Sequence, residues 1–146
     1  MNKYLNAGTP RVKLYINENA AWQNTLSLQS NEIPRFEKIL GEALTATFNA
    51  EENMDEGLAL KRQLLLQKNE MSELTVELDV QQWRLQNESK NNFIYNIQVL
   101  CSQDILKERI KHMEERYEDL KINFTKHLPA NPEIIVKCSR GELLPQ

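Results

Sequence analysis

Apolar residues recur at alternating steps of four and three residues in three separate stretches of the chain. This spacing places side chains on one face of an α-helix and is typical of helices that pack as coiled coils. The stretches predict helices over about 17–48, 52–89 and 94–128. Together they indicate an all-α protein. Their seam positions are, in chain order, Trp22, Leu26, Gln29, Ile33, Phe36, Leu40 and Ala43; Leu60, Leu64, Gln67, Met71, Leu74, Leu78, Gln81 and Leu85; and Leu106, Ile110, Met113, Tyr117, Leu120 and Phe124.

Pro34 lies inside the first predicted helix. Proline lacks an N–H donor and its ring crowds the preceding turn, so we expect a kink there. The seam keeps its phase on both sides of Pro34, which favours one bent helix over about 17–48. The alternative is that Ser30 or Asn31 caps a second helix with Pro34 in its first turn.

Short connections predict an antiparallel bundle of the three long helices, with a turn near 90–93. Helices of this length span about 45–57 Å, so we expect an elongated molecule. In this arrangement Leu85 is predicted to face Leu106, and Leu78 to face Met113.

The domain organisation predicted from these elements is a single helical bundle over 17–128. Residues 1–16 are interpreted as an extended leader, in which RVKLYI is a candidate short strand. Pro129 and Pro132 stop the last helix, so 129–146 is interpreted as a C-terminal tail. The tail either lies against the bundle or becomes ordered on contact with a partner.

A second apolar stripe runs along the middle helix through Leu58, Leu65, Val76, Val80 and Trp83. Such a stripe suits a central helix that contacts both neighbours, or a helix that also meets another subunit. The register brings Trp22 of the first helix near Trp83, either as a packed aromatic cap or as an exposed docking site. These six residues form the candidate interaction surface.

Three glutamines occupy seam positions, namely Gln29, Gln67 and Gln81. A buried amide needs hydrogen-bond partners and can fix the register or oligomeric state of a coiled coil. The alternative is that these long side chains extend out of a loosely packed seam into water.

Composition narrows the function classes. The net charge is -3 and the basic residues alternate with acidic ones, so we expect no nucleic-acid partner. Neither a signal peptide nor an apolar run of about 20 residues is evident, which favours a cytoplasmic protein with no membrane contact. Cys101 and Cys138 form no CxxC motif and are expected to be free thiols.

Motifs for catalysis are absent from the sequence. Glu108 precedes His112 by one helical turn, but the Glu-x-x-His motif of di-iron bundles does not occur. The acidic pairs are expected on solvated faces, paired with Lys111, Arg116 or Lys121 of the same helix. No activated nucleophile or glycine-rich phosphate loop is present. We therefore expect no catalytic, cofactor-binding or metal-binding residues and no cofactor.

Three segments carry a resemblance to small helical-bundle proteins of Bacteroidota that have no assigned activity. They are WQNTLSLQSNEIPRFEKILGEAL, QLLLQKNEMSELTVELDVQQWRL and LKERIKHMEERYEDLKINFTKHL, within about residues 20–128. In those proteins the first helix has no proline and starts nearer the N-terminus, so Pro34 and the leader depart from the pattern. The resemblance implies the bundle fold and carries no activity with it.

Two functional hypotheses follow. The first is a non-enzymatic structural or protein–protein interaction module, a helical scaffold that associates with itself or with a helix of another protein. The alternative is a ligand-binding or enzymatic bundle with a polar pocket around Gln29, Gln67 and Tyr117, which would need a perturbed titratable group beside the pocket.

Overall fold

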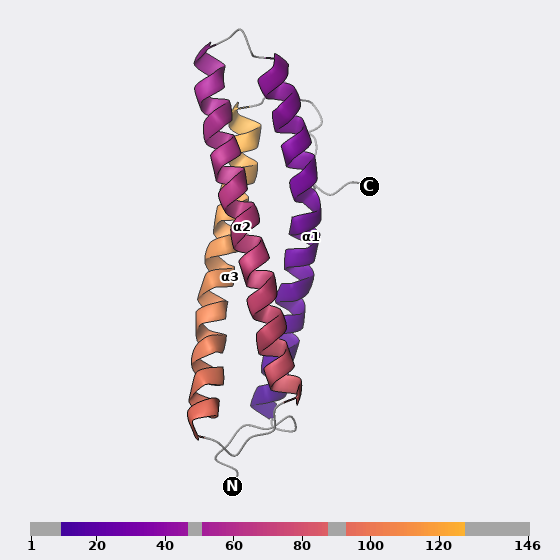
Figure 1. Ribbon diagram of the computed structural model, residues 1–146, viewed down its shortest axis with the longest axis vertical. Coiled ribbons are helices and arrows are strands. Elements are labelled where there is room, and N and C mark those ends of the chain that lie inside the picture. The colour runs from indigo at the N-terminus through magenta and orange to yellow at the C-terminus, as the bar shows by residue number, and fades with distance from the viewer. Residues whose placement is uncertain (1–9, 47–50, 88–92, 128–146) are drawn as a thin grey trace. The chain divides into compact units, whose positions relative to one another are not determined.

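The computed structural model describes residues 10–46, 51–87 and 93–127, and each of these ranges is one α-helix (Figure 1). Helix α1 spans Pro10–Ala46, α2 spans Glu51–Asn87 and α3 spans Phe93–His127. No strand occurs within these three ranges. The predicted all-α fold of three long helices is therefore confirmed. The turn near 90–93 lies mostly outside the described residues, and the tail over 129–146 lies wholly outside them.

Helix α1 begins at Pro10 and not near residue 17. Proline is favoured in a first helical turn, because its missing N–H would have no intrahelical partner there. The α1 seam also extends upstream in steps of three and four from Trp22 to Asn19, Tyr15 and Val12, and Val12 is only 2% exposed. The interpretation of residues 10–16 as part of an extended leader with a short strand is therefore wrong.

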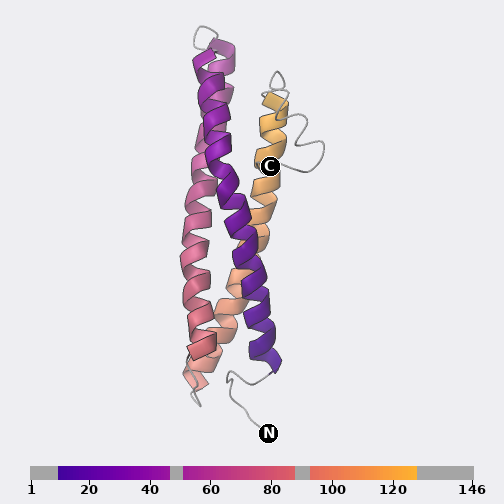
Figure 2. The same cartoon turned by 90° about the vertical axis from the view of Figure 1, so that its right-hand side faces the viewer.

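Helix α1 passes through Pro34 without interruption, as the single ribbon in Figure 2 shows. One helix, and not a second helix capped by Ser30 or Asn31, is the correct interpretation. Pro34 is exposed, so its ring lies on the solvent side of α1. The cost is the missing backbone N–H, which leaves the carbonyl of Ser30 without its usual helical donor.

Contacts divide the chain into two compact units, and the prediction of a single bundle domain stays a prediction. Unit 1 contains the described residues of Met1–Leu26 and Ser72–His112. Unit 2 contains those of Ser27–Met71 and Met113–Gln146. Each unit takes one segment from each of the three helices.

In unit 1, helix α2 runs antiparallel to both of its neighbours. Gln82 of α2 donates to the backbone oxygen of Ile16, while Gln23, further along α1, donates to Asp79. On the α3 side, Leu85 packs in one buried cluster with Val99 and Val12. Leu85 was predicted to face Leu106, so the predicted register of α2 against α3 was wrong by one heptad.

In unit 2, an aromatic cluster joins α1 to α3. The Phe36 ring meets Tyr117 edge to face at a centroid distance of 6.2 Å, and meets Phe124 at 4.7 Å. All three rings are buried, as are Met71 and Leu64 of α2. Edge-to-face contacts add about 0.5–1.5 kcal/mol to the burial of the rings, so this cluster helps to stabilise the unit.

Candidate interaction surface

The side of α2 that faces away from its seam carries exposed apolar side chains. All eight seam residues of α2, from Leu60 to Leu85, are at most 4% exposed. Val76, midway between the seam residues Leu74 and Leu78, lies about 200° around the helix from each of them and is 62% exposed. We call the exposed apolar residues the outer face of α2: Leu58, Leu65 and Leu66 in unit 2, and Val76, Val80 and Trp83 in unit 1.

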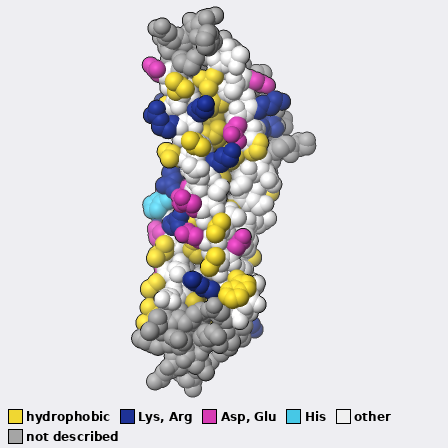
Figure 3. All heavy atoms as spheres, in the orientation of Figure 1, with side chains coloured by type: hydrophobic (Ala, Val, Ile, Leu, Met, Phe, Trp, Pro, Cys, Tyr) yellow, Lys and Arg dark blue, Asp and Glu magenta, His cyan; other side chains and the backbone are white. Residues whose placement is uncertain are grey.

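All five α2 residues of the predicted interaction surface belong to this outer face, with exposures from 45% to 62%. The neighbouring helices therefore cover these side chains only in part. Leu66, which is 64% exposed, was not predicted, because one apolar residue beside a seam is not distinctive. Figure 3 shows hydrophobic side chains among charged ones on the face turned to the viewer.

The two tryptophans differ in their surroundings. Trp22 of α1 is half-buried, whereas Trp83 is 56% exposed. A closed aromatic cap does not fit this exposure of Trp83. The ring of Trp83 is an accessible part of the outer face, and Trp22 is at most a partial contributor.

The outer face continues into a groove in each unit. In unit 1, Val76 and Val80 line a groove together with Ile105 and Leu106 of α3, flanked by Arg84. In unit 2, Leu64 and Leu65 of α2 line a groove together with Leu40 and Leu44 of α1. The charged residues Glu37, Lys61 and Lys68 also line it. Apolar floors with charged rims suit an amphipathic protein segment.

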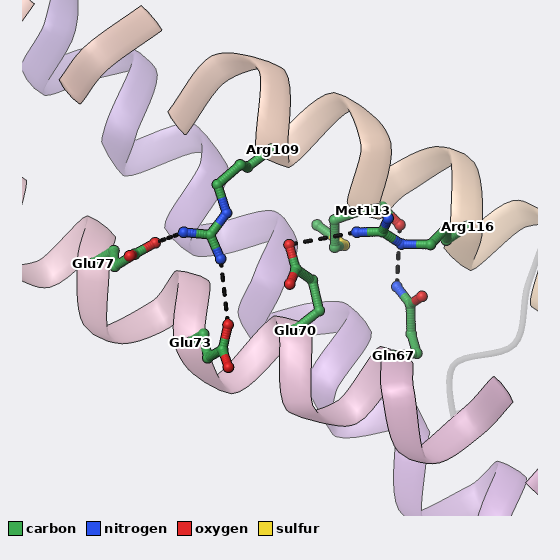
Figure 4. A network of polar contacts seen from close by, with 7 residues as sticks. All are labelled: Gln67, Glu70, Glu73, Glu77, Arg109, Met113 and Arg116. Atoms are coloured by element: carbon green, nitrogen blue, oxygen red, sulfur yellow. Dashed lines mark hydrogen bonds and ion pairs between the residues drawn. The ribbon is translucent and has the colours of Figure 1, made fainter. Parts of the chain in front are cut away.

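Polar pairs fix the register of α2 against α3 within each unit. In unit 1, Arg109 forms ion pairs with Glu77 and, at 3.5 Å, with Glu73 (Figure 4). In unit 2, Arg116 lies 3.4 Å from Glu70. Arg109 and Arg116 are one heptad apart, as are Glu77 and Glu70, so both units use the same offset between the helices.

Arg116 was predicted to pair with acids of its own helix, and its pair with Glu70 across the helices is a different outcome. Lys121 does pair along α3, with Glu118 at 2.7 Å, as predicted for the acidic face. Exposed pairs of this kind contribute only about 0–1 kcal/mol each. Their effect is therefore on register and direction more than on stability.

Gln81 is part of a buried chain of amides in unit 1. Its Nε2 donates to the backbone oxygen of Val99 at 3.1 Å and to Oε1 of Gln103 at 3.2 Å. Nε2 of Gln103 in turn donates to Oδ1 of Asn19 at 2.8 Å. This amide chain, Gln81, Gln103 and Asn19, connects all three helices, and each member is at most 2% exposed.

The other two seam glutamines lie in unit 2. Gln67 is buried and donates to the backbone oxygen of Met113 at 3.0 Å (Figure 4). Gln29 is half-buried, and its buried Oε1 has no hydrogen-bond partner. Gln67 and Gln81 therefore do not extend into water, and both tie helices together. Asn19 and Gln103 were not predicted, because a polar seam residue and a solvent-facing residue look alike in a sequence.

Glu32 of α1 is a buried carboxyl group that was not predicted either. It lies in unit 2 and is 6% exposed. Burial raises the pKa of Glu32, and the nearby Tyr117 hydroxyl and the charge of Lys121 lower it only in part. The predicted polar pocket would lie in this unit, yet Gln29, Gln67 and Tyr117 do not line the grooves described above.

Metal-binding clusters and membrane-spanning helices are both absent from the described residues. These residues contain no group of three His, Cys, Asp or Glu side chains that could hold a metal ion. His112 is exposed, and Cys101 is an exposed free thiol. Within the same part of the chain, every helix is too short or too polar to cross a membrane. Cys138 and the side chain of His127 lie outside the described set.

Comparisons with known proteins found no match to a family model, a curated protein or a solved structure. The resemblance to helical-bundle proteins of Bacteroidota therefore stays a prediction.

Proposed function

We propose that the protein is a non-enzymatic helical scaffold that binds a protein helix through the outer face of α2. The observation that carries this proposal is the exposure of Leu65, Val76 and Trp83 at 56–62% each on a helix whose own seam is already filled. Burial of apolar surface away from water is favourable by a free energy of about 25 cal/mol per Å². Exposed apolar patches on otherwise polar surfaces commonly mark interaction sites.

The form of the surface supports a helical partner. The exposed residues follow the length of one helix, and a groove lies beside them in each unit. A second helix laid along α2 would place its own apolar side chains into such grooves, as helix-in-groove recognition requires. We further propose a reducing, cytoplasmic location, which the exposed thiol of Cys101 supports.

Site-specific photo-crosslinking tests this function. A photoreactive amino acid replaces Val76 in the full chain, expressed in its native cells, and a matched variant carries it at Glu114, which is exposed on α3. We expect a discrete protein adduct from position 76 and none from position 114. The same adducts from both positions, or no adduct from position 76, would overturn the proposal.

A small-ligand site in unit 2 is the second candidate. It is supported by the buried carboxyl of Glu32 with its raised pKa, since perturbed groups gather at functional sites. A negatively charged, buried carboxylate would favour a small amine. This candidate predicts that a melting-temperature screen of small amines finds one that stabilises the wild type but not Glu32→Gln.

A further inference from the structure

We propose that the partner on the outer face of α2 is the same face of a second copy of this chain, aligned antiparallel. This inference rests on the proposed function and adds the identity and register of the partner. The twofold axis of this antiparallel pair would pass between Asn69 and Ser72 of each copy. Three features of α2 support it, namely a second seam, the charges on that seam and its symmetry.

One exposed stripe of α2, which we call its second seam, carries four apolar and four polar side chains. From Leu58 to Trp83 the positions again alternate in steps of four and three, and every side chain is exposed. A repeat of this kind keeps one stripe of a helix against a partner helix along its whole length. The members of this second seam are Leu58, Arg62, Leu65, Asn69, Ser72, Val76, Asp79 and Trp83.

The order of residues in the second seam is self-complementary when two copies run antiparallel. Leu58 then lies opposite Trp83 of the second copy, and Leu65 lies opposite Val76. Both layers pair apolar side chains, which favours their removal from water.

The polar layers of the second seam also match. Arg62 lies opposite Asp79 of the second copy, a pair of opposite charges. Asn69 lies opposite Ser72 beside the axis, where the amide and the hydroxyl can hydrogen-bond. Asp79 accepts a hydrogen bond from Gln23 through Oδ1 only, at 2.8 Å, and remains exposed. Its carboxylate can therefore also accept from a guanidinium.

Other alignments of the same two faces are less favourable. A parallel pair would place Arg62 against Arg62 and Asp79 against Asp79, and like charges in contact oppose association. An antiparallel pair shifted by one heptad in either direction would separate Arg62 from Asp79 and set an apolar residue against Asn69 or Ser72. Only the alignment centred between Asn69 and Ser72 satisfies every layer.

The seam is about 38 Å long and one helix wide, so we place it in the small interface class of less than about 1,200 Å². Interfaces of this class include weak and transient complexes.

Light scattering across a dilution series tests the inference. We expect the 17.1 kDa chain to approach twice that mass as its concentration rises through the micromolar range. Arg62→Asp sets two acids in each charged layer and should weaken association about tenfold or more. The exchange of both, Arg62→Asp with Asp79→Arg, should restore it to within about threefold of the wild type. Circular dichroism confirms that each variant is folded.

The direction and register are tested by disulfide trapping. Asp55 and Gln86 extend the seam by one layer at each end, are exposed, and lie opposite each other in the proposed pair. Variants Asp55→Cys and Gln86→Cys, each with Cys101→Ser and Cys138→Ser, are mixed and oxidised. We expect a mixed disulfide between the two variants. Disulfides of each variant with itself alone would show a parallel pair and overturn the inference.

The outcomes separate this inference from the function on which it rests. A chain that stays monomeric, or a dimer that Arg62→Asp alone does not weaken, overturns the inference. If position 76 then crosslinks to a different protein, the scaffold function stands with another partner. If position 76 crosslinks to nothing, both proposals fail.

Discussion

The buried polar residues of this protein specify the alignment of its helices more strongly than its exposed charged residues do. Gln81, Gln103 and Asn19 were placed among apolar seams, where an unpaired amide costs about 1–3 kcal/mol. Pairing them across three helices offsets part of that cost, and Nδ2 of Asn19 and Oε1 of Gln81 stay buried without a partner. The pairing leaves a penalty for any other alignment. The sequence could indicate Gln81 as a seam residue. It could not show which partners Gln81 finds, because these depend on side chains from two other helices.

Gln103→Leu is predicted to destabilise the protein although it adds an apolar residue to the core. Asn19 and Gln81 would each lose a partner while still buried, at a cost of about 1–3 kcal/mol. Urea denaturation measures the free energy of unfolding. Gln98→Leu, on the exposed side of α3, is the matched control and should change it by less than about 0.5 kcal/mol. Equal effects of the two variants would show that the amide chain is not energetically coupled.

Glu32 is predicted to make stability fall as pH rises. Its folded pKa lies above its ordinary value of 4.5, so the folded state holds the proton more tightly than the unfolded state. Stability from this group is full below pH 4.5 and is lost as pH rises through the raised pKa. Glu32→Gln should therefore gain stability relative to the wild type at pH 7 and not at pH 4.

The measurement is chemical denaturation of wild type and variant at both pH values. Glu42→Gln, at an exposed position of α1, is the control for general charge effects. A difference between Glu32→Gln and the wild type that does not change with pH would argue against a raised pKa.

Each helix was recognisable in the sequence because an apolar repeat of four and three residues suits few structures besides a packed α-helix. The start of α1 was missed because Asn19 interrupts the apolar series with a polar residue that is nevertheless buried. The register of α2 against α3 was missed because heptad seams look the same after a shift of seven residues. The observed register forms two such pairs, Arg109 with Glu77 and Arg116 with Glu70, whereas a shift of seven residues would leave only one.

The space around the two glycines of the described helices predicts different effects of their replacement by alanine. A Cβ at Gly41 would meet nothing within 4 Å, so Gly41→Ala should stabilise by about 0.5–1 kcal/mol. A Cβ at Gly57 would lie 2.5 Å from Cδ2 of Leu44. Leu44 would have to move, so Gly57→Ala should gain less or lose stability. Urea denaturation of both variants tests the comparison, and a larger gain from Gly57→Ala would contradict it.

At the scale of the whole molecule, the feature that matters for function is the set of apolar residues that stay exposed although the helix seams are buried. The sequence could indicate the outer face of α2, because its stripe does not fit a single seam. The division into two units was not visible, since no change of composition or periodicity marks Leu26, Met71 or His112. Such a boundary depends on how densely the three helices contact one another. The pattern of residue types along the sequence does not contain this information.

Self-association predicts that thermal stability depends on protein concentration. Only folded chains form the dimer, so mass action raises the melting temperature as the protein concentration increases. Leu65→Glu would place a charge opposite Val76 of the second copy and should abolish the dependence. Scanning calorimetry over a hundredfold concentration range measures this. A concentration dependence retained in Leu65→Glu would point to a different interface.

The direction of the hydrogen bonds along the amide chain is set at one of its ends. The backbone oxygen of Val99 can only accept, so Gln81 must turn its NH2 group toward it. The NH2 group of Gln81 also meets Oε1 of Gln103, which fixes that amide in turn and then presents a donor to Oδ1 of Asn19. The backbone oxygen of Val99 on α3 thus sets the orientation of the Asn19 amide on α1, through the two glutamine side chains between them. Reversing any one amide would set oxygen against oxygen or NH2 against NH2, so the three amides can only be oriented together.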